Sequence, residues 1–152
     1  YLAWQSRAET VEAMAAWAPR VFTLSGAGDP ERVRGKAVSQ GTFEILRVAP
    51  ILGRTFIPEE DRPKDDGVVI LGHDLWQRRF AGNSQVVGQN VILNSRPRTV
   101  VGVMPPGFKF PEDAELWVPL GLDTTMFTRT DHFCAVCRRA IERVIDLYSR
   151  IN

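Results

Sequence analysis

The chain has 152 residues, of which 44% are hydrophobic and 24% charged, as expected for one globular domain. Its 19 Lys and Arg against 18 Asp and Glu give a formal net charge of +1, so no excess of basic residues favours nucleic-acid binding. No run approaches about 18 consecutive apolar residues, which excludes a bilayer-spanning segment within the sequence. Because the chain begins with Tyr1 and not Met, we expect it to be part of a longer protein.

The first forty residues predict a helix followed by a hairpin. Apolar residues recur at helical spacing over Tyr1–Ala18, where Ala is abundant, and Pro19 would end the helix. Val21–Leu24 is a short apolar run typical of a strand. Ser25–Pro30 has the composition of a turn, and Arg32–Ser39 alternates well enough for a second strand.

The next segment combines a loop, a buried strand and a short helix. Thr42–Leu46 resembles one helical turn, and Pro50–Pro63 is loop-like. Val68–Leu71 is an uninterrupted apolar run that predicts a buried strand. Asp74 can cap the short helix that follows. The apolar residues of this helix are Leu75, Trp76 and Phe80.

A second hairpin and two final elements complete the prediction. Val91–Leu93 and Arg98–Val103 are apolar runs joined by Asn94–Pro97, and Leu116–Val118 is a short strand. Asp131–Ile151 has a strong amphipathic pattern that predicts a helix. Interleaved strands and helices with hairpins predict an α+β fold: a mixed sheet with packed helices.

Nucleotide-binding motifs are incomplete in this sequence. A P-loop would require Gly at position 30 and Ser or Thr after Gly35-Lys36, but Pro30 and Ala37 stand there. A dinucleotide fingerprint beginning at Gly26 and Gly28 would require a third Gly where Glu31 stands, so we interpret this segment as a polar hairpin turn.

Two polar groups could suggest catalysis or cation binding. His73 and Asp74 are adjacent, so they should not face each other on a helix, and no nucleophile elbow accompanies them. We therefore expect His73 to be structural or solvated. Glu59–Asp61 lacks an EF-hand pattern, and a solvated acidic loop is the favoured reading.

Cysteine chemistry is the remaining option. Cys134 and Cys137 form a CxxC pair with His132 nearby, which could be a redox centre or part of a zinc site, but no fourth ligand is evident. We favour buried or incidental thiols. Trp76 and Trp117 lie within apolar elements and are predicted core residues. We therefore predict no catalytic, cofactor-binding or metal-binding residues, no cofactor and no enzyme activity.

Read as phrases, the chain resembles the periplasmic core domain of MacB-like and FtsX-like ABC-transporter permeases, and within them the duplicated permease group common in acidobacteria. The resemblance covers about residues 1–133, and its specificity comes from the order and spacing of short phrases. These phrases are Arg32–Gly35 with Val38 and Ser39, Leu46–Phe56, Val69–Leu71 through Leu75–Phe80, Val87–Gly88, Leu93–Asn94, Thr99–Pro105 and Leu116–Leu120.

The resemblance implies a single extracytoplasmic domain between two membrane helices, with a porter-like lobe and a smaller lobe. It implies no active site, because ATP is hydrolysed on a separate cytoplasmic domain. The domain would transmit ATP-driven motion and contact export substrates, a periplasmic adaptor or lipoproteins, on the outer face of the cell membrane. Gly53 and Gly102 would meet backbone requirements at a turn and within a hairpin.

Residues 134–152 depart from the family pattern, because they contain no Pro or Gly. We expect the amphipathic helix there to pack within the domain. Two alternatives stay open on the sequence alone. One is a stand-alone soluble module that binds a protein through this helix, and the other is a small thiol-redox or zinc protein that uses Cys134 and Cys137.

Overall fold

The computed structural model describes residues 14–26, 28–62, 67–121 and 134–137. Two α-helices, two 3₁₀ turns and eight strands are present in this part of the chain. The elements are, in chain order, β1 (Met14–Ser25), β2 (Glu31–Val38), α2 (Thr42–Ile45), β3 (Leu52–Gly53), η1 (Pro58–Glu60), β4 (Val68–Leu71), α3 (His73–Phe80), η2 (Ser84–Val86), β5 (Asn90–Leu93), β6 (Arg96–Val103), β7 (Leu116–Pro119) and β8 (Cys134–Cys137).

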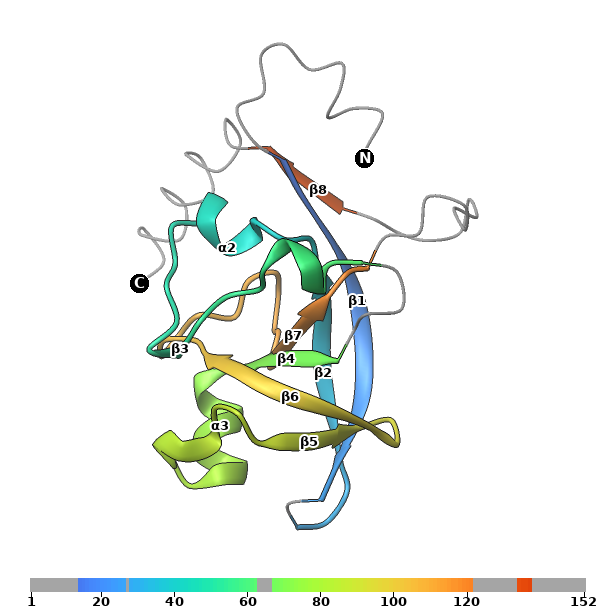
Figure 1. The fold of residues 1–152 in the computed structure, drawn as a ribbon, viewed down its shortest axis with the longest axis vertical. Coiled ribbons are helices and arrows are strands. Elements are labelled where there is room, and N and C mark those ends of the chain that lie inside the picture. The colour runs from blue at the N-terminus through green and yellow to red at the C-terminus, as the bar shows by residue number, and fades with distance from the viewer. Residues whose placement is uncertain (1–13, 27, 63–66, 122–133, 138–152) are drawn as a thin grey trace.

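The strands form one mixed sheet that closes on itself. Its order is β2-β7-β4-β6-β5-β1-β8, and β1 also pairs with β2, so six strands complete a ring. Two of the neighbouring pairs, β2–β7 and β4–β6, are parallel, and the others in the ring are antiparallel. Closure leaves these six strands with few free edges. Figure 1 shows β1 along one side of the molecule, with β8 beside its first residues.

Apolar residues pack on both sides of the ring. One cluster fills the inside and includes Leu24, Val100 and Leu116, which are fully buried. A second cluster covers the outer face of β4, β6 and β7, with Phe43 of α2 against Trp117. Strands buried on both faces read as uninterrupted apolar runs, which is why 68–71 and 116–118 were recognisable in the sequence. The predicted α+β class with a mixed sheet and hairpins is confirmed.

The predicted helix over Tyr1–Ala18 is wrong where the structure describes it. Met14–Ser25 is one strand, paired with β2 from Trp17↔Val38 to Leu24↔Glu31. Cross-strand packing overrides the helix propensity of the alanines here. Pro19 fits in the strand because it lies between the stretches paired with β8 and β5, where one edge of β1 has no strand partner among the described residues.

The predicted helix over Asp131–Ile151 is also wrong at its start, since Cys134–Cys137 is strand β8, paired with Met14–Trp17. The rest of that prediction lies outside the described residues. The amphipathic pattern did not reveal that Cys134–Cys137 adds a strand to the sheet.

The second predicted hairpin is present, but its turn and the cap of α3 differ from the prediction. The β5–β6 hairpin has a tighter turn than predicted: two residues, Asn94 and Ser95, both with positive φ (50° and 65°), as in the turn that best matches strand twist. Asp74 is not the helix cap. Gly72 occupies that position, and Asp74 lies in the first turn of α3. A side chain at Gly72 would meet the Glu115 carbonyl oxygen, with Cβ at 2.7 Å.

Gly53 and Gly102 face each other across the β3–β6 pair. A Cβ on Gly53, whose φ is +70°, would overlap the Val101 carbonyl oxygen, and one on Gly102 would lie 2.5 Å from the Arg54 carbonyl oxygen. The expected backbone requirement at both positions is therefore present, and it lets β3 approach β6 closely. The loop predicted over 50–63 is mostly irregular but contains this short strand and η1.

Candidate functional site

A cleft of about 230 Å³ lies between β2, the start of α3 and the segment that leads into β7. We call it the charged cleft. The ionisable residues that line it are Arg34, His73, Asp74, Arg78, Lys109, Asp113 and Glu115. They come from three separate parts of the sequence, so the closed sheet brings them together.

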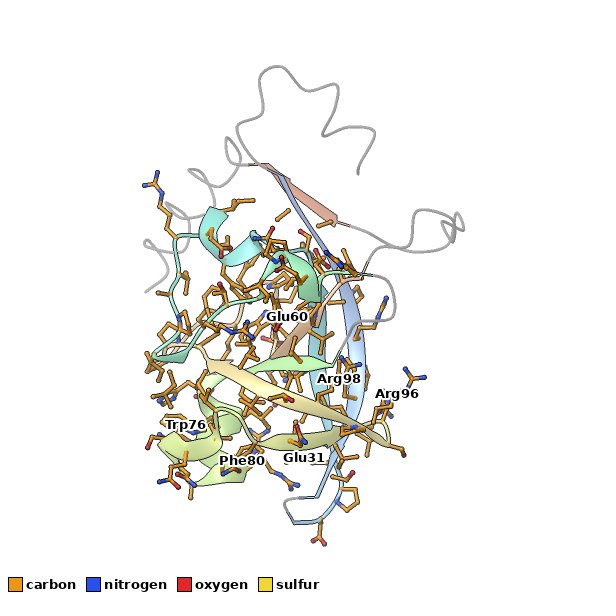
Figure 2. All side chains as sticks on the ribbon, viewed as in Figure 1. Glu31, Glu60, Trp76, Phe80, Arg96 and Arg98 are labelled. Atoms are coloured by element: carbon orange, nitrogen blue, oxygen red, sulfur yellow. The ribbon has the colours of Figure 1, made fainter. Side chains whose placement is uncertain are left out.

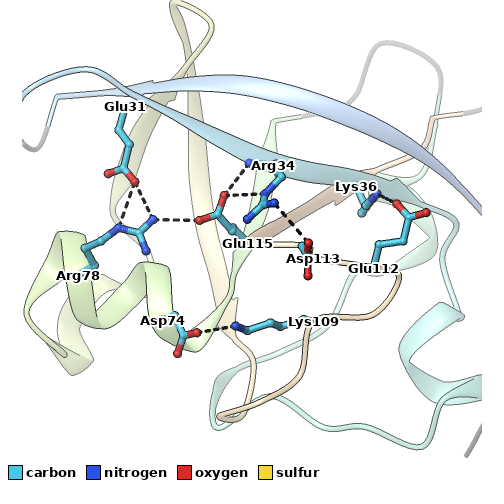
Figure 3. Close-up of polar contacts among 9 residues, drawn as sticks. All are labelled: Glu31, Arg34, Lys36, Asp74, Arg78, Lys109, Glu112, Asp113 and Glu115. Atoms are coloured by element: carbon cyan, nitrogen blue, oxygen red, sulfur yellow. Dashed lines mark hydrogen bonds and ion pairs between the residues drawn. The ribbon is translucent and has the colours of Figure 1, made fainter. Parts of the chain in front are cut away.

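Glu115 is the centre of the ion pairs in the charged cleft (Figure 3). Its carboxylate accepts hydrogen bonds from the Arg34 backbone N–H at 2.8 Å and from Arg78 Nη2 at 3.0 Å. Arg78 also donates to Glu31, with Nη2 2.7 Å from Oε1, and this bond raises the pKa of the Arg78 guanidinium. Arg34 Nη1 completes the chain of contacts at 3.3 Å from Asp113.

A second pair crosses the mouth of the charged cleft. Lys109 Nζ lies 3.0 Å from Asp74 Oδ2, and its hydrogen bond holds the pKa of that carboxyl below its usual value. His73 Nδ1 is 3.8 Å from Asp74 Oδ1, so the two adjacent side chains come closer than the helix geometry predicted. The His73 ring packs edge-on against Trp76, with centroids 5.5 Å apart.

At the charged cleft, β2, α3 and the segment before β7 contact one another through ion pairs. Every Asp, Glu, Lys and Arg that lines it has an oppositely charged partner within 4 Å. Its lining contains no Ser, Thr or Cys that His73 could activate as a nucleophile. The ion pairs therefore connect three separate parts of the chain at this cleft.

Lys36 adds a further contact between β2 and the segment before β7. Its side chain is buried, and Nζ lies 2.7 Å from Glu112 Oε2 and 5.0 Å from the ring centroid of Trp17. A buried ammonium requires such partners. Lys36, which is the lysine of the incomplete P-loop pattern, thus has a structural role in the contact between β2 and the segment before β7.

The acidic loop at Glu59–Asp61 is more than a solvated surface. Glu60 accepts two hydrogen bonds from Arg54, at 2.7 and 3.0 Å, and a third from the Ile57 backbone N–H at 3.1 Å. The Arg54 bond lowers the pKa of the Glu60 carboxyl. Asp61 accepts from the backbone N–H groups of Gln40 at 2.7 Å and Gly121 at 2.9 Å. These carboxylates close loops, and none of the described residues form a group of three metal-ligating side chains.

The two tryptophans are core residues, as predicted. Trp117 has no exposed surface and Trp76 is 8% exposed. Each indole N–H donates to a backbone carbonyl at 2.9 Å, from Trp76 to Asn83 and from Trp117 to Phe110. Figure 2 shows Trp76 and Phe80 together on α3.

The CxxC pair lies in an extended strand. Cys134 is opposite Trp17 and Cys137 is opposite Met14 in the β1–β8 register. A strand separates such Cα atoms by about 10 Å, whereas a disulfide requires about 7 Å or less. The described backbone therefore does not suit a disulfide between them. His132, the third residue of that hypothesis, lies outside the described residues.

The sequence did not reveal the ion pairs of the charged cleft. Glu115 contacts residues 81 and 37 positions away, and no short motif marks such pairs. The alternation at the start of β2, where exposed Arg32 and Arg34 flank buried Val33, is the signal that could have indicated that Arg34 faces away from the core.

Comparison with known proteins identifies the architecture. The family model described as the MacB-like periplasmic core domain matches residues 2–143. A search of curated proteins gives no match. In the part of the chain that the structure describes, neither α2 nor α3 has the length and hydrophobicity of a membrane-spanning helix.

Solved structures of three transporter or permease domains are similar, each with a TM-score of 0.64. The extracellular domain of the noncanonic ABC-type transporter YknZ from Gram-positive bacteria is 20% identical, and the match covers 84% of this chain and 65% of that one. The periplasmic region of MacB from Actinobacillus actinomycetemcomitans is 14% identical, with 93% and 80% covered. A domain of a putative permease from Porphyromonas gingivalis is 14% identical, with 90% and 60% covered.

These identities show a shared fold, and the chain spans less than two thirds of two of the three structures. The family model covers nearly the whole sequence. On that match, the chain belongs to the family of MacB-like periplasmic core domains.

Proposed function

We propose that this chain is a non-catalytic domain of an ABC-transporter permease that transmits ATP-driven motion outside the membrane. In this proposal the chain is one extracytoplasmic domain over residues 1–152. ATP is hydrolysed by a cytoplasmic ATPase domain, and the outer surface contacts an export substrate, a periplasmic adaptor or a lipoprotein. The family match supports the permease context.

The observation that carries the proposal is the continuity of β1. This strand has 12 residues, a length of about 40 Å. It pairs with β8 over Met14–Trp17, with β2 along most of its length, and with β5 at Leu24 and Ser25. A displacement applied where β1 and β8 meet therefore reaches the far end of the ring through backbone hydrogen bonds, without crossing a loop (Figure 1).

The ion pairs of the charged cleft support a mechanical role. Its ion pairs tie β2, the next strand to β1, to α3 and to the segment before β7. Ion pairs of this kind fix the position of one element relative to another, because each carboxylate is hydrogen-bonded to a cation on a different element. The domain would then move as one body when β1 moves.

Hydrogen–deuterium exchange of the full-length permease tests the proposal. We expect the amides of Met14–Trp17 and Cys134–Cys137 to change their exchange rates between the nucleotide-free and ATP-bound states. Amides of the β4–β6 pair should be unchanged, because neither strand takes part in the β1–β8 pairing where the displacement would enter, and they are the internal control. Identical exchange of β1 and β8 in both states would contradict the transmission role.

A further inference from the structure

A second cleft, of about 270 Å³, opens beside the start of β6 and the end of β7. We call it the arginine cleft. Its cationic lining residues are Arg20 of β1, Arg96 and Arg98 of β6, and Arg62, which follows η1. Phe22 and Val118 form part of its apolar floor. Figure 2 labels Arg96 and Arg98 near the strands β6 and β1.

Strand alternation explains why arginines gather at this opening. On β1 the inward row passes from fully buried Leu24 through buried Phe22 to exposed Arg20. On β6 the corresponding row passes from buried Val100 through Arg98 to exposed Arg96. Both rows therefore leave the core and end in guanidinium groups at the opening.

Arg98 forms the wall of the arginine cleft. It is buried, its guanidinium carbon lies 5.6 Å from the ring centroid of Phe22, and it is engaged within the fold. The argument for a ligand therefore rests on Arg20, Arg62 and Arg96, which are exposed.

The charge balance of the arginine cleft differs from that of the charged cleft. The described residues that line it include no Asp or Glu. Arg20 donates to the carbonyl of Pro19 at 3.1 Å, and none of Arg20, Arg62 and Arg96 pairs with a described carboxylate. Several guanidinium groups around one apolar floor repel each other until an anion lies between them.

We propose that the arginine cleft binds a small organic anion. The carboxylate or phosphate head would lie among Arg20, Arg62 and Arg96, which can bind either group through two parallel hydrogen bonds. The apolar body would lie on Phe22, Val118 and Leu120. A volume of about 270 Å³ suits a head group with a short hydrocarbon chain.

Calorimetric titration of the full 152-residue chain tests this site with four probes: hexanoate, hexyl phosphate, inorganic phosphate and hexylammonium. We expect saturable binding of a hexyl anion at millimolar concentration or below, weaker binding of inorganic phosphate, and no binding of hexylammonium. Comparison of hexanoate with hexyl phosphate distinguishes the two head groups. The double variant Arg20→Gln/Arg96→Gln should weaken binding at least about tenfold, the loss expected for a charge-assisted contact.

Arg32→Gln is the matched control, because Arg32 is an exposed arginine of β2 outside the cleft. It should leave the affinity unchanged. If the double variant does not fold, Arg62→Gln alone should weaken binding. Arg62 lies two residues after the end of η1 and belongs to no strand, so its replacement should not disturb the sheet.

Three results would overturn the proposal. The first is no binding of either hexyl anion at millimolar concentration. The second is equal weakening by Arg32→Gln, which would indicate attraction to the net charge and not a site. The third is binding only after Asp65→Asn/Asp66→Asn. These two residues lie outside the described part of the chain, and such a result would mean that the chain's own carboxylates occupy the arginine cleft.

Discussion

Replacing Trp117 by Ala should remove a large share of the stability of the domain. The indole has no exposed surface, and its ring packs against Phe43 at 5.9 Å and Phe108 at 5.3 Å between centroids. Truncation of a buried Trp to Ala costs about 3–5 kcal/mol. The Phe110 carbonyl would also lose its donor at 2.9 Å, and burying an unsatisfied acceptor costs about 1–3 kcal/mol.

These terms overlap, so we expect a loss of about 4 kcal/mol in the free energy of unfolding. Domains of this size have about 5–15 kcal/mol in total. Urea unfolding followed by circular dichroism measures the change. Trp117→Phe is the matched control: it keeps ring packing and should cost about 1–2 kcal/mol. A Trp117→Ala midpoint equal to that of the wild type would refute the packing described for the outer cluster.

The β3–β6 contact, the Arg54–Glu60 ion pair and nucleotide binding can each be tested separately. Gly53→Ala should destabilise the domain by about 2–3 kcal/mol in urea unfolding, because the φ of Gly53 is positive and an added Cβ would overlap the Val101 carbonyl. A cost below about 0.5 kcal/mol would mean that β3 is not held against β6. Glu60→Gln should lower stability at pH 7 by about 1 kcal/mol. The difference in stability between the wild type and this variant should disappear as pH falls from about 5 through the folded-state pKa of Glu60. A carboxyl whose pKa is lowered by folding stabilises the fold while it is ionised and loses this contribution on protonation. A difference that does not change with pH contradicts the Arg54–Glu60 pairing. The chain itself should not bind ATP in calorimetry, and micromolar affinity would contradict the non-catalytic role.

Local signals made much of the sheet predictable. Val69–Leu71 and Leu116–Val118 are buried on both faces, so their sequences carry no polar interruption. The tight turn at Asn94 and Ser95 lies where the sequence placed a hairpin. The two tryptophans were recognisable as core because they lie inside these apolar elements.

Pairing over long distances was not predictable from local pattern. The sheet closes because β2 pairs in parallel with β7, bringing Gly35 opposite Leu116. The first half of β1 looked helical because alanine favours helices, and only its strand partners decide otherwise. The ion pairs of Glu115 and the arginines of the arginine cleft come together through the same closure of the sheet. No short sequence motif therefore predicts either feature.

In the proposed function this chain lies outside the membrane as part of a permease. Arg32→Cys in the full-length permease, with Cys134 and Cys137 replaced by Ser, places one thiol on an exposed position of β2. A membrane-impermeant maleimide added to intact cells should label it as fully as after permeabilisation. Labelling that requires permeabilised membranes would place the domain on the cytoplasmic side and contradict the proposed location.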